Sequence, residues 1–166
     1  MPDKATLERA KKDKREGKAP TTQAGEFVRE EIEHIREGKH GARSAKQAIA
    51  IGLSKARRAG VDLPPPEKGS TSEKTRQSAA SAYRAGQKGD DEGSPARSRA
   101  TTRALKREGH AAATKKALAK QAHAAAKDKT ASERSVAARK AANTKGAAGR
   151  SAAAKKAART RSRSGK

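Results

Sequence analysis

The segment SAKQAIAIGLSKARRAG, residues 44–60, decides the fold that we expect for this chain. It opens with the S-x-x-Q form of a capping box, in which the Ser44 and Gln47 side chains satisfy free N–H groups at a helix start. Basic residues occupy the last turn, where they suit the helix dipole, and Gly60 is a natural stop. Small and apolar residues recur between these ends at helical spacing: Ala45, Ala48, Ile49, Gly52, Leu53 and Ala56. The segment therefore predicts an amphipathic helix over residues 44–58.

A second helix is expected before it, beginning at a threonine cap (Thr21 or Thr22) and ending near Glu37, with Gly38 as its stop. Its apolar face holds Phe27, Val28, Ile32 and Ile35. The intervening residues 39–43 are few enough to join the helices as an antiparallel pair. Gly52 and the neighbouring alanines would allow this pair to approach closely.

The charged residues of the pair have two interpretations. The acidic residues between 26 and 37 are expected on an exposed helix face. The basic residues of the second helix are expected on a solvated face, where some pair with these acids. Alternatively, residues 44–58 would be the recognition helix of a helix-turn-helix, with secondary nucleic-acid contacts from Lys46, Lys55, Arg57 and Arg58.

Outside the pair, large apolar side chains are scarce. The 166 residues include one Phe, one Tyr and no Trp, and the net charge is +23. Low hydrophobicity with high net charge is typical of disorder. We therefore expect an all-α fold, a small helical hairpin with largely disordered basic flanks, in which the Ala-rich tail can also be drawn as helices. Such a hairpin is marginal alone, so homodimerisation through residues 22–63 or the binding of a ligand could stabilise it.

Composition, charge and the expected helices together divide the chain into four segments. Residues 1–21 form a polar N-terminal helix or arm, and 22–63 form the hairpin. Residues 64–93 are a Pro/Ser/Gly-rich linker with a possible short helix at 73–85. Residues 94–166 are a basic Ala/Lys/Arg-rich tail with 21 basic and 3 acidic residues. An asymmetry of this kind is typical of a nucleic-acid-binding arm.

The tail repeats itself. The sequence SVAARKAANTK at 135–145 aligns with SAAAKKAARTR at 151–161, with seven identities in 11 positions. Each copy begins with a serine that could cap a helix, and Gly146 and Gly149 separate the copies. Alanine favours helix, but neighbouring cations repel, so we expect helix to form mainly on phosphates.

Duplex DNA is the expected partner, bound without sequence preference through its phosphates, with RNA as an open alternative. Stacking on single strands needs several aromatic side chains, which the chain lacks. The basic residues expected to contact nucleic acid are Arg97, Arg99, Arg103, Lys106, Arg107, Lys115, Lys116, Lys120, Arg134, Arg139, Lys140, Lys145, Arg150, Lys155, Lys156, Arg159, Arg161 and Arg163.

No pattern predicts an enzyme, so no catalytic residue, cofactor or metal ligand is expected. The chain has no Cys, and its four His residues, at positions 34, 40, 110 and 123, lack metal-ligand spacing. No apolar run reaches the roughly 20 residues of a membrane helix, and the first residues lack the apolar stretch of a secretory signal. We therefore expect no membrane partner and a cytoplasmic, nucleoid location.

The run KQAIAIGLSKA at 46–56 resembles the K-Q-A-I-A-I-[AG]-[LM]-S-x-A signature of a family of small basic bacterial proteins of unknown function. Those proteins also carry an element similar to Glu37-Gly38-Lys39, and the resemblance covers about residues 27–58. It implies a bacterial source and no activity. The tail looks like that of linker-histone-like bacterial proteins, by composition alone.

The sequence thus predicts a nucleoid-associated, histone-like protein that binds DNA through its basic tail. A disordered stress protectant is one alternative, although it would not need its charge concentrated in one half. An RNA- or ribosome-associated basic protein is the other.

Overall fold

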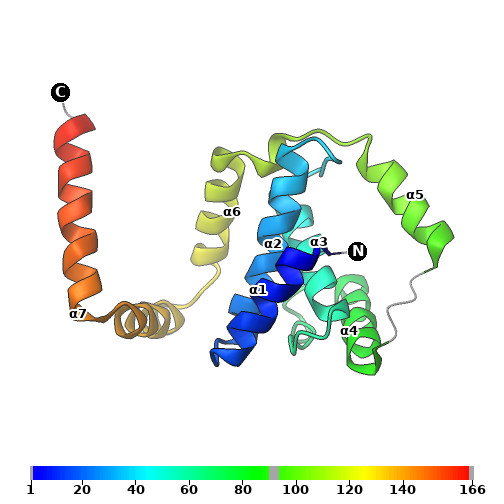
Figure 1. Cartoon of the computed structure of the whole chain (residues 1–166), viewed down its shortest axis with the longest axis horizontal. Helices are drawn as coiled ribbons and strands as arrows, with labels where there is room; N and C mark the ends of the chain where they lie inside the picture. Colours follow the sequence, from blue (N-terminus) through cyan, green and yellow to red (C-terminus); the bar gives the residue numbers. More distant parts are fainter. Residues whose placement is uncertain (1, 90–93, 165–166) are drawn as a thin grey trace. The chain divides into compact units, whose positions relative to one another are not determined.

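A computed structural model describes residues 2–89 and 94–164, apart from the side chains of Arg97 and Ser164, and the described chain is helical. It divides into two parts, Met1–Gln121 and Ala122–Lys166. The elements are α1 (Lys4–Arg15), α2 (Pro20–Arg36), α3 (Ala45–Arg58), α4 (Glu73–Lys88), α5 (Pro95–Leu105), a 3₁₀ turn η1 (Ala111–Ala113), α6 (Lys115–Lys127) and α7 (Ala131–Ser164) (Figure 1). Within the described residues, no helix is both long and apolar enough to cross a bilayer.

The predicted helical hairpin is confirmed as α2 and α3. The Ser44 hydroxyl accepts a hydrogen bond from Gln47 N at 3.2 Å, and the Gln47 amide oxygen accepts one from Arg43 N at 2.8 Å. Gly38 and Gly60 follow the two helices in the left-handed region, at φ 75° and 80°. The start of α2 differs from the threonine cap that the sequence predicts, because Pro20 occupies the first turn, where a missing N–H costs nothing.

Gly52 allows α2 and α3 to touch backbone to backbone. A Cβ built on Gly52 would lie 2.6 Å from Cα of Val28 and 3.0 Å from O of Phe27. Such distances are far inside van der Waals contact, so no larger residue fits without moving a helix. The expected close approach of the hairpin helices is therefore confirmed.

Helix α1 covers one end of the hairpin. The apolar cluster at this end consists of Ala10, Ala24, Phe27, Ala56 and Val61, with Leu7, Leu53 and Leu63 packed at its edge. The predicted N-terminal helix is thus part of the folded core, because its few apolar residues face the start of α2.

The first part of the predicted tail covers the other end of the hairpin. Here the core consists of Ile32, Ile35, Ala42, Ala48, Ala112 and Ala113, with Val28 and Leu118 at its edge. Backbone hydrogen bonds join Gly41 N to the Leu105 carbonyl (2.9 Å) and Ala42 N to the Gly109 carbonyl (3.1 Å). Residues 105–118 are therefore a folded part of the core, and their alanines act as small core residues.

Helix α4 packs against α3, where the sequence predicts a linker with a short helix. Ala79 and Ala82 are buried, and a Cβ on Gly86 would lie 1.8 Å from the Arg57 carbonyl oxygen. The Tyr83 hydroxyl also donates to Asp62 at 2.7 Å. Close contact through small residues replaces the large apolar side chains that this segment lacks.

The expectation of largely disordered flanks is wrong for the described residues, since α1, α4, α5, α6 and α7 lie in them. In the tail the physical reason is the helix propensity of alanine, together with a capping box at the start of α7. There Glu133 N donates to the Thr130 hydroxyl at 3.2 Å, while Thr130 N donates to the Glu133 carboxylate at 2.7 Å. Ser135 and Ser151 lie inside helical segments and are not the caps that the repeat suggested.

The reason for expecting a homodimer also weakens. The hairpin's apolar residues pack against α1 and against residues 105–118 of the same chain. Contacts that were expected from a second copy are thus supplied within one chain.

Candidate nucleic-acid interface

The basic residues of the predicted tail are distributed over three helices and the turn after α5. Helix α5 carries Arg97, Arg99 and Arg103, and Lys106 and Arg107 follow it. The side chain of Arg97 lies outside the part of the chain that the structure describes. Helix α6 carries Lys115, Lys116 and Lys120, and α7 carries Arg134, Arg139, Lys140, Lys145, Arg150, Lys155, Lys156, Arg159, Arg161 and Arg163.

Every one of these side chains that the structure describes is exposed. Within the described residues, none of them lies within 4 Å of a carboxylate, although Arg134, Arg150 and Arg161 donate hydrogen bonds to the backbone carbonyls of Lys129, Ala142 and Ala157. Exposed cations without a paired carboxylate keep their full charge available to an external anion.

Basic residues of the N-terminal half are used differently. Arg9 pairs with Glu26, and Lys18 contacts Asp13 and Glu16 at 2.6 and 2.7 Å. Hydrogen bonds from the Lys18 ammonium to Asp13 and Glu16 raise the pKa of this group above its usual range. Part of the positive charge in this half is therefore paired with carboxylates inside the fold, whereas Lys4, Lys14 and Arg15 of α1 are exposed.

The four secondary contacts suggested for α3 divide into two pairs. Lys46 and Arg58 are exposed. Arg57 is buried, donates to the Leu63 and Pro64 carbonyls at 3.0 and 3.3 Å, and has its pKa lowered by burial. Lys55 contacts the Glu30 and Glu31 carboxylates at 3.4 and 2.7 Å. Arg57 and Lys55 therefore serve the fold.

These contacts also bear on the helix-turn-helix alternative. Helix α3 contacts α2, α4 and η1, so several of its faces are covered by its own chain. A recognition helix must present one free face along its length to a groove. The predicted solvated face is reduced to Lys46, Ala50 and the end of the helix at Arg58.

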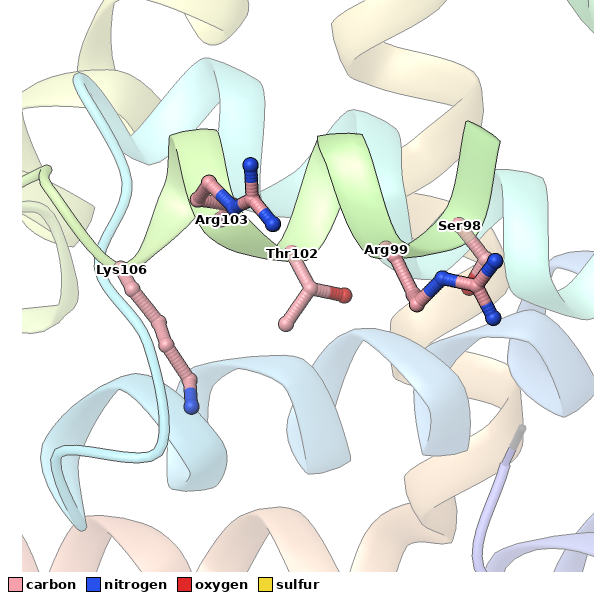
Figure 2. Close-up of a pocket in the computed structure, with 5 residues that line it drawn as sticks. All are labelled: Ser98, Arg99, Thr102, Arg103 and Lys106. Atoms are coloured by element: carbon pink, nitrogen blue, oxygen red, sulfur yellow. The ribbon is translucent and has the colours of Figure 1, made fainter. Parts of the chain in front are cut away.

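Arg99 and Arg103 of α5 and Lys106 directly after it line one surface depression. Figure 2 shows Arg99, Arg103 and Lys106 with the hydroxyls of Ser98 and Thr102, and these five residues line that depression. At about 100° per residue they fall within an arc of roughly 140°. Guanidinium groups with adjacent hydroxyls can share one phosphate or bind neighbouring phosphates.

Helix α7 carries the sequence repeat in two helical segments. Gly146 has φ 64° and ψ 171°, which interrupts the helix, so 131–145 holds the first copy and 147–164 the second. Cations point around the whole circumference of each segment, and Val136 is an exposed large apolar residue, at 63%. A helix that is polar all round has no face to pack on a core. The two segments suit an external, charged surface.

One polar cluster was missed by the sequence analysis. Glu31 is fully buried, and its carboxylate faces His40, whose Nε2 lies 3.4 Å from Oε1. Glu31, His34 and His40 each place one ligand atom within 4.8 Å of the other two. The prediction that the acids of residues 26–37 lie on an exposed face is therefore wrong for Glu30 and Glu31, which are 2% and 0% exposed.

A signal for this burial was present in the sequence. Glu31 is four residues from Phe27 and four from Ile35, so it occupies the apolar face itself. His34 follows Glu31 by one helical turn. The position of His40 beside them depends on the turn after α2, which helical spacing does not describe.

Residues 11–68 match a family model described as a family of unknown function, DUF6496. The span includes the α2–α3 hairpin and the Glu31 cluster, and excludes α4 to α7. The match agrees with the expectation of an uncharacterised family, and the description of that family names no activity. Neither the curated proteins nor the solved structures include a significant match to this chain.

Proposed function

We propose that this chain is a histone-like, nucleoid-associated protein that binds duplex DNA without sequence preference. The observation that supports the proposal is the set of exposed cations on α5, α6 and α7, which have no carboxylate within 4 Å in the described residues. Such groups release condensed counterions when they meet phosphates, and this release drives non-specific binding.

The folded N-terminal part would serve as a base for the charged helices. Residues 105–118 are anchored on the hairpin, so α6 begins at a defined place in the core. Helix α7 then extends binding over two charged segments joined at Gly146. A bend between them would let each segment follow phosphates on a curved backbone.

The test is a fluorescence anisotropy titration of the full chain on a labelled random-sequence duplex at several salt concentrations. With about ten phosphate contacts, log K should fall against log salt with a slope near −9, at ~0.9 per phosphate. Replacing Lys155, Lys156, Arg159 and Arg161 by Gln should make that slope shallower by about 3.6.

A matched variant controls for net charge alone. Lys4, Lys11, Lys14 and Arg15 are exposed on α1, and their replacement by Gln removes the same four charges from the opposite end of the chain. We expect this variant to change the slope by less than about 1. Equal changes in both variants, or no binding at low salt, would refute the proposal.

Structured RNA of equal length serves as a parallel ligand. Tighter binding of RNA at the same salt would favour an RNA- or ribosome-associated protein, since RNA offers the same phosphates in a different geometry. Protection of a heat-labile enzyme without affinity for either nucleic acid would favour the stress-protectant alternative.

A further inference from the structure

The Glu31 carboxylate is buried without adequate hydrogen bonding. No described residue donates a hydrogen bond of good geometry to Oε1 or Oε2. The cations and rings nearest to it are Lys55, with Nζ 2.7 Å from Oε2, and His40, with Nε2 3.4 Å from Oε1. A buried charge in this state is costly unless it is paired and fully hydrogen-bonded or binds a metal.

The tautomer of His40 makes the environment of the Glu31 carboxylate less favourable still. Nδ1 of His40 lies 3.0 Å from the Gly41 carbonyl oxygen, which can only accept, so Nδ1 carries the proton. In the neutral ring, Nε2 then holds a lone pair. That lone pair is 3.4 Å from a carboxylate oxygen, so two acceptors face one another in a buried place. A cation between them removes the repulsion.

We propose that Glu31, His34 and His40 form a binding site for a divalent transition-metal ion, most readily Zn²⁺. Two imidazoles with one carboxylate are a ligand set that zinc accepts, with a fourth position left for water or another ligand. Bonds of about 2.0–2.1 Å in a tetrahedral site place neighbouring ligand atoms roughly 3.4 Å apart. The observed 3.4 Å between Glu31 Oε1 and His40 Nε2 fits this spacing.

The surrounding groups supply outer support. The Gly41 carbonyl orients His40, and the Asp3 carboxylate lies 3.3 Å from Nε2 of His34. Partners of this kind orient metal-binding imidazoles and raise their basicity. Two further carboxylates, those of Asp3 and Glu30, lie beside His34, and nearby negative charge favours a bound cation.

A second set of candidate ligands overlaps the first and is weaker. It combines His34 with Asp3 and Glu30. Both Glu30 oxygens already have partners, since Oε2 accepts from Asp3 N at 3.1 Å and Oε1 from Lys55 at 3.4 Å. Asp3 is exposed, so water can hydrogen-bond its carboxylate. The carboxylate that is buried without a hydrogen-bond partner is therefore that of Glu31.

A metal here would fasten the turn after α2. His40 precedes Gly41 and Ala42, whose N–H groups donate to the carbonyls of Leu105 and Gly109. The ion would tie this turn to α2 and so support the place where residues 105–118 dock. This inference does not depend on whether the chain binds DNA.

The experiment uses the tag-free full chain, stripped with a chelator, dialysed and titrated with ZnCl₂, with CoCl₂ as a spectroscopic probe. We expect one tight equivalent of Zn²⁺, a raised Tm and visible cobalt bands typical of low coordination number. Glu31→Gln, His34→Gln and His40→Gln should each weaken binding by at least about 10- to 100-fold, the loss typical even of outer-shell partners. His123→Gln, at an exposed histidine of α6, is the matched control and should bind as the wild type does.

Two results would overturn the proposal. One is absence of stoichiometric Zn²⁺ or Co²⁺ binding by the wild-type chain, which needs no variant to fold. The other is unchanged binding in all three ligand variants that circular dichroism shows to be folded. Either result would mean that Glu31, His34 and His40 do not form a metal site.

Discussion

At the scale of single residues, Gly52 is the most constrained position of the hairpin. Gly52→Ala would force α2 and α3 apart, because the added methyl meets the backbone of Val28 and Phe27. Overpacking of this kind costs about 1–3 kcal/mol, of which the better helix propensity of Ala recovers up to about 1. We expect the free energy of unfolding to fall by about 1–2 kcal/mol in urea denaturation.

Gly25 provides the matched control on the facing helix. It lies inside α2, and a Cβ built there would meet nothing within 4 Å. Gly25→Ala should therefore leave stability unchanged or raise it by up to about 1 kcal/mol. A Gly52→Ala variant as stable as Gly25→Ala would contradict the close helix contact.

Glu133 makes the start of α7 sensitive to pH. Hydrogen bonds from the Thr130 backbone N–H and hydroxyl lower the pKa of Glu133 from its ordinary value of 4.5. A carboxylate whose pKa is lower in the folded than in the unfolded state stabilises the folded state at every pH above its unfolded pKa. This stabilisation is lost as the pH falls through the folded-state pKa. We expect the Cα chemical shifts of residues 131–134 to lose helical character between pH about 5 and about 2.

Glu133→Gln separates this effect from general acid unfolding. Its amide oxygen can still accept from Thr130 N, as in a capping box, but it does not titrate in this range. The helical shifts of residues 131–134 should then be independent of pH over the same interval. A pH response equal to that of the wild type would mean that Glu133 is not its source.

At the scale of elements, Gly146 sets the bend in α7. Ala is disfavoured at φ 64° by about 1–2 kcal/mol and favoured in a helix interior, so Gly146→Ala should join the two segments into one straight helix. The chain has no Cys, so spin labels can be placed at Ser135→Cys and Ser151→Cys alone. In a straight helix these positions are about 24 Å apart along the axis.

In Gly146→Ala we expect the distance between the two spin labels to be longer, and its distribution narrower, than in the wild type. Gly149→Ala is the control, since Gly149 lies within a helical segment and has no positive φ. It should leave the distance unchanged. A distance that is the same in all three chains would show that the bend does not depend on Gly146.

The elements also show where sequence patterns succeed. The α2–α3 hairpin, its glycine stops and the Ser44 capping box follow from local rules, because each depends on residues within a few positions of one another. For α4 the sequence predicts only a possible short helix at 73–85 within a linker, and it does not predict the packing of this helix on α3, because that contact uses alanine and glycine and small residues give no apolar pattern. The Glu31 cluster was missed because acids on an apolar stripe were assumed to be exposed.

At the scale of the whole molecule, the folded core ends later in the chain than residue 94, where composition places the start of the basic tail. A chain ending at Lys129 keeps residues 105–118 and α6, and loses a segment with 11 basic residues and one acidic residue. It should unfold at the same urea midpoint as the full chain and show a shallower salt dependence of DNA binding. A chain ending at Ala104 should be destabilised, because Ile32, Ile35 and Ala48 lose their cover.

Urea denaturation of the three chains checks this boundary. Loss of residues 105–118 should lower the unfolding free energy by several kcal/mol, at about 25 cal/mol per Å² of apolar surface exposed. A chain ending at Ala104 that is as stable as the chain ending at Lys129 would show that residues 105–118 add nothing to the core.

The sequence by itself determined the helical class, the α2–α3 hairpin with its glycine contact, and the concentration of positive charge toward the C-terminus. These follow from composition and from periodicities a few residues long. Only the tertiary structure decided that Ala112 and Ala113 complete the core, that α4 packs on α3, and that His40 faces a buried Glu31. The physical reason is that small and polar residues are compatible with many environments, so their burial depends on partners that are distant in the chain.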